Sequence, residues 1–203
     1  MNTHEFRVAP ALKRLAPWLA AVLLAAAVDG RGAGNEAVAA AAPKRLGIAG
    51  GYFTCALPAD WGRQDDELKP GDKTYLLLLL GPRAENAPVM IFVSFFGPGN
   101  DDFKDYADFV TRNTTDPWED KPVAEARKIT LNGRNALWFE REAKKFLHPE
   151  SKSDESVMIK EKFYVLLAKD RAGFFVLHYS APSSVFAEHL AAFEKVASTF
   201  EVL

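Results

Sequence analysis

The side chains that could carry out catalysis gather near the C-terminal end of the chain, where His178, Ser180 and the pair Ser183–Ser184 follow one another. A hydrolase needs a serine activated by a base, and a third group must orient that base. No Gly-x-Ser-x-Gly turn is present, and His178 and Ser180 alternate along a strand, so they point to one face. We therefore predict no catalytic residue here, and we interpret Ser183 or Ser184 as the cap of a last helix.

The single cysteine, Cys55, offers the other potential nucleophile. It lies inside the apolar segment YFTCAL, where a free cysteine is typically a small buried group and not a reactive thiol. A chain with one cysteine has no internal disulfide, so its core must be stable without one.

Acidic residues form two groups that could attract a divalent cation: Asp65–Glu67 in an early loop, and Asp101, Asp105 and Asp108 on one side of a helix. Neither group has the spacing of a calcium loop, and the histidines are too far apart in sequence for a zinc pair. The Gly97–Asn100 loop lacks the Gly-Lys-Ser/Thr ending of a phosphate-binding loop. We predict no cofactor and no metal site, and divalent-metal binding stays open as an alternative.

Three residues are better suited to recognition than to catalysis. Trp118 lies in a Pro-rich, charged link, and Phe146 and His148 lie in a second charged segment, KKFLHPESKSDES. Aromatic side chains are enriched among the anchors of protein interfaces. We therefore name Trp118, Phe146 and His148 as candidate partner-binding residues, although covering an edge of the sheet is the favoured role of Trp118.

The elements that must position these residues are mainly strands. Segments 52–57, 74–81 and 89–96 read as strands, and the last two are almost continuously apolar, which indicates cover on both faces. Asn132–Gly133 between two strand-like runs predicts a hairpin, because both turn positions favour positive φ. A second hairpin joins 157–169 to 173–180.

Two helices complete the pattern. Asn100 is the expected N-cap of the first, whose apolar stripe is Phe103, Tyr106, Ala107 and Val110, with Phe109 at its edge. The second helix ends the chain, with an apolar stripe made of Phe186, Leu190, Phe193, Ala197 and Phe200. Hairpins joining most strands predict an α+β fold, an α/β/α sandwich with a central, largely antiparallel sheet of about seven strands and two main helices. The face of the sheet that His178 occupies stays open.

The N-terminal segment differs in kind from the rest. Arg7, Lys13 and Arg14 precede an uncharged apolar run from Leu15 to Val28, shorter than the roughly 20 residues that span a bilayer. This pattern is typical of a secretory signal peptide. We predict a signal peptide at 1–27, a flexible tether at 28–46 and one domain at 47–203. The protein is then exported, periplasmic or secreted, with no stable membrane insertion after cleavage.

Charge restricts the class of partner. The 25 basic and 27 acidic residues give a net charge of −2, which is not the basic footprint of a nucleic-acid-binding protein. We therefore expect no nucleic-acid partner.

Three landmarks together resemble the PsbP-like and DcrB-like exported domains: LPADW at 57–61, LNGRNA at 131–136 and YSAP at 179–182 before the last helix. The resemblance spans 51–203. It implies the antiparallel α/β/α sandwich shared with a Ran-binding nuclear import factor, and typically a non-enzymatic accessory role. No partner-binding residue carries over, because only structural landmarks match, and a shared fold does not fix a function.

These observations predict a non-enzymatic accessory or binding domain that binds another envelope protein. The alternative is a small-ligand or divalent-metal binding module.

Overall fold

A computed structural model describes residues 45–47, 53–65, 72–116, 119–147, 155–168 and 172–203. All of them belong to the compact unit Ala41–Leu203. The predicted signal peptide, Trp118 and His148 lie outside the described residues. Among the helices that are described, none is long and apolar enough to cross a membrane.

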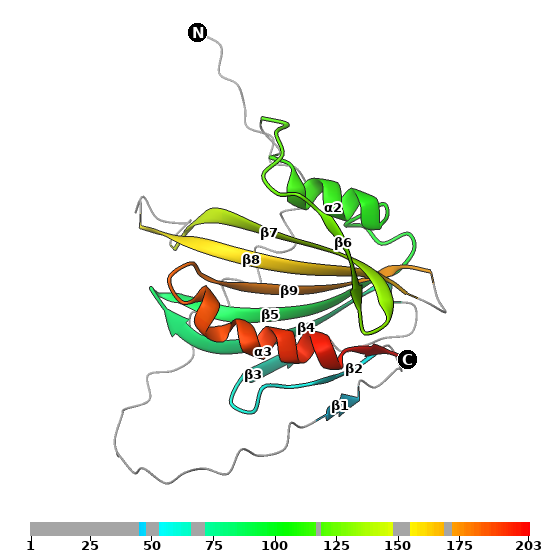
Figure 1. Ribbon diagram of the computed structural model, residues 1–203, viewed down its shortest axis with the longest axis horizontal. Coiled ribbons are helices and arrows are strands. Elements are labelled where there is room, and N and C mark those ends of the chain that lie inside the picture. The colour runs from blue at the N-terminus through cyan, green and yellow to red at the C-terminus, as the bar shows by residue number, and fades with distance from the viewer. Residues whose placement is uncertain (1–44, 48–52, 66–71, 117–118, 148–154, 169–171) are drawn as a thin grey trace. The chain divides into compact units, whose positions relative to one another are not determined.

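The core of the fold is an antiparallel seven-stranded sheet with the order β3-β4-β5-β9-β8-β7-β6 (Figure 1). Its strands are β3 Gly62–Asp65, β4 Thr74–Ala84, β5 Ala87–Phe96, β6 Arg127–Leu131, β7 Arg134–Phe146, β8 Ser156–Leu167 and β9 Phe174–Pro182. The predicted sheet is therefore confirmed, and β9 ends at Pro182, which cannot donate to a ladder.

A second, three-stranded sheet has the order β1-β2-β10. It consists of β1 Arg45–Gly47, β2 Phe53–Ala56 and β10 Glu201–Val202. Our first predicted strand, β2, thus lies outside the central sheet, and the segment we read as a loop supplies β3 in its place. The reason is non-local, because β2 pairs with β10 at the far end of the chain.

Helix α3, Phe186–Thr199, covers one face of the central sheet (Figure 1). Phe186, Phe193 and Ala197 are buried as predicted, and they share a core with Phe175 and Tyr179 of β9. The predicted serine cap is wrong, because Val185 is the N-cap residue and has no side-chain cap bond.

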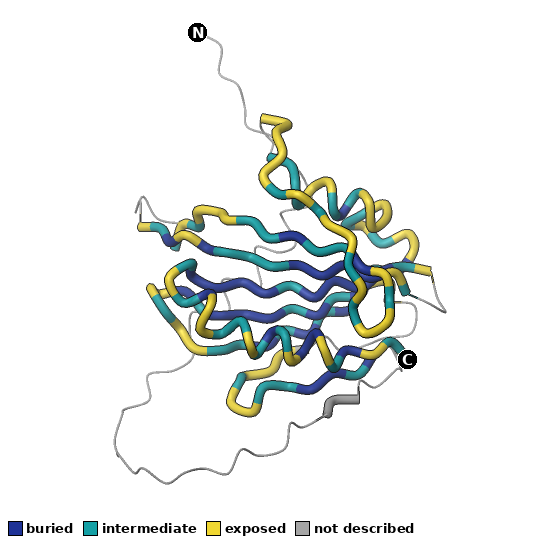
Figure 2. The backbone as a smooth tube through the Cα atoms, in the orientation of Figure 1, coloured by how far each residue is buried: buried dark blue, intermediate teal, exposed yellow. Residues whose placement is uncertain are grey.

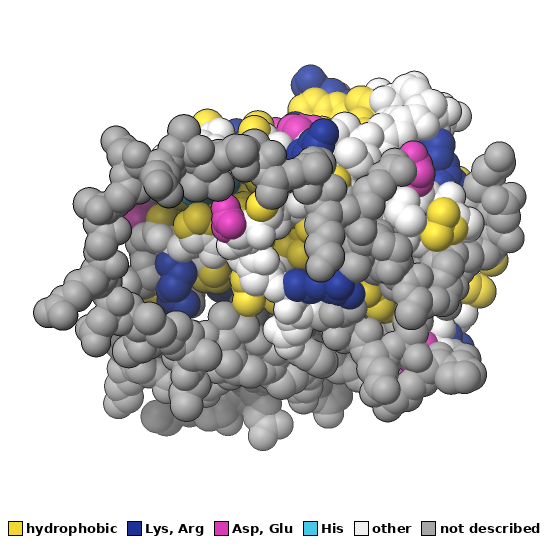
Figure 3. Space-filling model, turned by 90° about the horizontal axis from the view of Figure 1, so that it is seen from below, with side chains coloured by type: hydrophobic (Ala, Val, Ile, Leu, Met, Phe, Trp, Pro, Cys, Tyr) yellow, Lys and Arg dark blue, Asp and Glu magenta, His cyan; other side chains and the backbone are white. Residues whose placement is uncertain are grey.

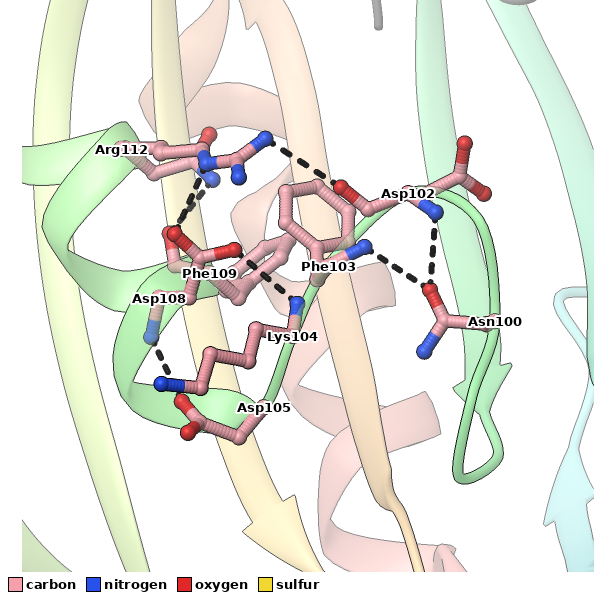
Figure 4. Close-up of polar contacts among 9 residues, drawn as sticks. Asn100, Asp102, Phe103, Lys104, Asp105, Asp108, Phe109 and Arg112 are labelled. Carbon is pink, nitrogen blue, oxygen red and sulfur yellow. Dashed lines mark hydrogen bonds and ion pairs between the residues drawn. The ribbon is translucent and has the colours of Figure 1, made fainter.

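Helix α2, Tyr106–Thr114, begins later than predicted. The Asn100 side-chain oxygen accepts from the backbone N–H groups of Asp102 and Phe103, which makes a turn, and Asp105 caps the helix by accepting from Asp108 (Figure 4). An asparagine side chain can accept hydrogen bonds from the backbone N–H groups that follow it either in a turn or at the start of a helix. The sequence does not distinguish the two, so the helix was predicted to begin too early.

The buried face of α2 also differs from the predicted stripe. Phe109 is buried, whereas Tyr106 and Ala107 are exposed, which reverses part of the predicted stripe. Phe109 packs with Phe163 and Phe174, and Phe103 contacts it edge-on.

Alternate residues of β9 show that the two helices lie on opposite faces of the sheet. Phe174 and Val176 share a cluster with Phe109 of α2, whereas Phe175 and Tyr179 share one with α3. Because successive side chains of a strand point to opposite faces, this alternation confirms the α/β/α sandwich. We call the two surfaces the α2 face and the α3 face.

Both predicted hairpins are present. Asn132 and Gly133 form the β6–β7 turn with φ of 50° and 74°, and the Asn132 side-chain amide donates to the carbonyls of Ala197 and Phe200. In the β8–β9 hairpin, Gly173 has a φ of 122°. The segment 144–156, predicted as a loop, is instead partly strand, because β7 runs to Phe146 and β8 begins at Ser156.

Candidate functional site

Phe146 is the predicted binding residue that the structure describes, and it lies at the end of β7. Its side chain is 48% exposed. Met158 of β8, at 46%, is exposed in the same region, which sequence reasoning missed. In the β7–β8 register, Lys144 is opposite Met158 and Phe146 is opposite Ser156.

That register places Lys144, Phe146 and Met158 on one face, the α3 face, as diagonal or direct neighbours. The Lys144 ammonium lies 5.4 Å from the centre of the Phe146 ring. We call these three residues the Phe146–Met158 patch. Two large apolar side chains next to each other, beside a cation, form a small surface suited to a partner side chain.

Exposed apolar residues occur elsewhere too. Leu167 at the other end of β8 is 54% exposed, and from below, hydrophobic side chains lie between Lys and Arg side chains on the described surface (Figure 3). Single exposed apolar residues are ordinary on proteins. The Phe146–Met158 patch therefore differs from the single exposed residues because its two apolar side chains are adjacent on one face, and not because they are exposed.

A charged cluster lies on the α2 face, and it settles the position of His178. The His178 ring stacks between Phe92 and Phe163, with ring centres 5.0 and 4.1 Å away. Its Nε2 lies 2.9 Å from Oε1 of Glu161, and Nε of Arg141 donates to Oε2 of the same carboxylate over 2.6 Å. Three neighbouring strands, β7, β8 and β9, thus each supply one residue of a hydrogen-bonded cluster.

The Glu161 carboxylate is 13% exposed. Burial by itself raises its pKa, but the charges and hydrogen bonds of His178 and Arg141 outweigh burial and lower the pKa to about 2. Burial also lowers the pKa of Lys145, and the Glu161 charge opposes this in part. The carboxylate therefore stays ionised, and it binds Arg141 of β7 and His178 of β9.

The cluster also reaches helix α2. One Nη of Arg141 donates to the carbonyl of Asn113, in the last turn of α2, over 3.2 Å. Its guanidinium lies 5.2 Å from the centre of the Phe163 ring. Glu161 therefore orients an arginine that attaches α2 to the sheet.

The serines do not assemble a hydrolase site with His178 in the described structure. The Nε2 atom of His178 contacts Glu161, and Ser180 is 4% exposed. Ser184 donates to Glu85, and the buried Ser183 hydroxyl has no hydrogen-bond partner within the described part of the chain. A nucleophile needs both an activating base and access for substrate.

Cys55 is fully buried and free, in agreement with the prediction that it is a small core residue. Burial raises the pKa of its thiol to about 11, while the Arg63 charge opposes this in part. Since the thiolate is the reactive form, Cys55 is a poor nucleophile at neutral pH.

The aspartates of the first helix region bond within the chain (Figure 4). Asp105 caps α2, and Asp108 accepts from the Lys104 backbone N–H with one oxygen and from Arg112 with the other. Over the described ranges, no three His, Cys, Asp or Glu residues are grouped to hold a metal ion. Most of the Asp65–Glu67 group lies outside those ranges.

Sequence reasoning missed Arg141, Glu161 and Met158. Arg141 and Glu161 stand in charged runs, EREAKK and KEK, that read as solvated, and nothing local indicates that they pair.

Comparisons with known proteins add little to this geometry. No protein-family model matches the chain, and no curated protein matches its sequence. Among solved structures, the chain is similar to cyanobacterial PsbP (CyanoP) from Synechocystis sp. PCC 6803. That similarity has a TM-score of 0.46 and 14% identity over 84% of this chain and 98% of the other.

Proposed function

We propose that this protein is an exported, non-enzymatic domain that binds another protein of the cell envelope through the Phe146–Met158 patch. The observation that carries the proposal is the pair of large apolar side chains, each nearly half exposed, side by side on one face. Aromatic residues and methionine are enriched at protein interfaces. Export rests on the basic and apolar pattern of the predicted signal peptide.

Two features support a binding role. The end of the β7–β8 hairpin belongs to the two longest strands of the sheet, and their register continues to Phe146 and Ser156. The patch is therefore presented on a regular ladder, so little conformational entropy is lost when a partner binds. The residues weighed as nucleophiles lack an assembled base or access, so they give an enzyme no comparable support.

The test is co-purification with the full-length protein from cross-linked envelope extract. The double variant Phe146→Ala, Met158→Ala should lose a protein that the wild type captures. Leu167→Ala is the matched control, since Leu167 is an exposed apolar residue at the opposite end of β8. The control should retain the captured protein.

Two results would contradict the proposal: no specific protein captured by the wild type, or equal capture by the double variant. In the first case, a raised melting temperature on adding a small molecule or a divalent cation would favour the alternative binding module.

A further inference from the structure

The outer edge of β7 is only partly covered. β6 pairs with β7 from Arg134 to Trp138, where Trp138 lies opposite Arg127, while β8 pairs with the other edge as far as Phe146. Figure 1 shows β6 crossing one end of β7, while the other end continues beside β8 with no described strand along its outer edge. We call residues 140–146 the free edge of β7.

The backbone groups of this edge can be assigned from the two ends of the strand. Arg134 closes the tight two-residue turn to Leu131, so its N–H and C=O face β6, whereas the Leu147 N–H bonds to Glu155 on the β8 side. Directions alternate along an antiparallel ladder. The backbone N–H and C=O groups of even-numbered residues therefore point to the outer edge of β7, away from β8. Those of Glu142, Lys144 and Phe146 bond to no residue in the described ranges.

The side chains along the free edge are accessible. Glu142, Ala143, Lys144 and Phe146 are all exposed, and this end of β7 is one of the exposed stretches in Figure 2. An unpaired strand edge with exposed side chains is a template for a further strand. The edge also ends at the Phe146–Met158 patch.

Charge indicates what kind of strand fits. Arg141 and Lys145 lie on the α2 face of the edge, and Glu161 is the carboxylate that acts on both. On the α3 face the edge carries Glu140 and Glu142 and then ends in Lys144 and Phe146, so the excess of positive charge lies on the α2 face. A complementary strand would therefore carry carboxylates on the side that continues the α2 face, opposite Arg141 and Lys145. On its other side it would carry an apolar residue next to Phe146.

We propose that the partner protein inserts an extended, acidic–apolar segment that pairs with the free edge of β7 and extends the sheet. This inference rests on the proposed function, because it names how the partner binds at the Phe146–Met158 patch. Backbone hydrogen bonds to the edge supply affinity, and side chains on alternate faces supply specificity.

A second copy of this chain fits less well than an acidic segment. In an antiparallel pair centred on Ala143, Arg141 of one copy would lie opposite Lys145 of the other, on the same face, and this would occur twice. Like charges directly opposite one another destabilise a pair of strands. A register centred on Glu142 would instead set Glu140 opposite Lys144. The proposal therefore commits to a different protein because of the positive charge of Arg141 and Lys145, and a homodimer is an outcome that the test detects.

The test uses the full-length protein and a short synthetic peptide of alternating valine and glutamate. Amide resonances of 140–146 should shift on addition, with slowed hydrogen exchange at Glu142 and Lys144. The same peptide N-methylated at alternate residues cannot donate, so it should bind about tenfold or more weakly. A valine–lysine peptide should bind more weakly as well.

A protein variant gives the second arm. Glu142→Pro removes an outward N–H without touching the bonds to β8, and Glu142→Ala is its matched control. Peptide affinity should fall about tenfold in the proline variant and change little in the alanine variant. Unchanged melting curves confirm that the proline variant is folded, and a misfolded proline variant leaves the N-methylated peptide as the deciding measurement.

Three outcomes would overturn the inference: no shift along 140–146 at millimolar peptide, equal binding of the N-methylated peptide, or a dimer that Glu142→Pro abolishes. If the patch variants lose the captured envelope protein while these peptide results are negative, the proposed function stands and strand addition fails. If the peptide binds the edge but no envelope protein is captured, the proposed function fails instead.

Discussion

Replacing Glu161 by glutamine tests whether the charged cluster on the α2 face stabilises the fold. The folded-state pKa of Glu161 is about 2, against an ordinary value of 4.5. A depressed acid pKa stabilises the folded state above the unfolded value, and this stabilisation is lost as pH falls through the folded value. A difference of about 2.5 units corresponds to roughly 3 kcal/mol at pH 7.

At pH 3, between the two pKa values, the same linkage leaves about 1 kcal/mol. Glu161 is 13% exposed, so solvent screening reduces these values little. The carboxylate is also what compensates Arg141, and removing one member of a buried pair is costly. We therefore expect Glu161→Gln to lower the free energy of unfolding by about 3 kcal/mol at pH 7 and about 1 kcal/mol at pH 3.

Urea denaturation of wild type and variant at both pH values measures this difference. Glu142→Gln is the control on the same hairpin, because Glu142 is exposed, and it should change stability by less than about 0.5 kcal/mol. A Glu161→Gln loss below about 1 kcal/mol at pH 7, or a loss equal at both pH values, would refute the reasoning.

Two further predictions concern the β8–β9 hairpin and the buried cysteine. Gly173→Ala should lower the free energy of unfolding by about 1–3 kcal/mol, because a φ of 122° strains any other residue and the new Cβ would collide with the Phe96 carbonyl oxygen. A melting temperature equal to that of the wild type would contradict this prediction. Cys55 should react with a thiol reagent at neutral pH only as fast as the protein unfolds, because burial raises its pKa to about 11; rapid labelling of the folded protein would show that the thiol is accessible.

The parts of the fold that sequence predicted are those with a local cause. Asn132–Gly133 specifies its turn because both residues tolerate positive φ, and the apolar stripe from Phe186 to Phe200 specifies a helix and its buried face. Near-continuous apolar strands indicated a sheet covered on both faces, and the α2 and α3 faces agree with that.

Predictions failed where two local solutions compete. Asn100 and Asp105 can each cap a helix, and Ser183 and Ser184 can cap or bond elsewhere. The packing of Phe109 against the sheet selects the helix start, and a sequence pattern does not contain that contact.

Turn chemistry and periodicity act within a few residues, so the amino-acid sequence predicts most of the strands, both helices, the two hairpins and the α/β/α class. Long-range packing is what pairs β2 with β10 and what joins His178 and Arg141 through Glu161. It also leaves the outer edge of β7 beyond Trp138 without a paired strand among the described residues. Glu161 is 17 residues from His178 and 20 from Arg141, and the register of three strands brings them together. Register is set by the packing of whole faces, so no local pattern reveals which charges meet or which edge stays free.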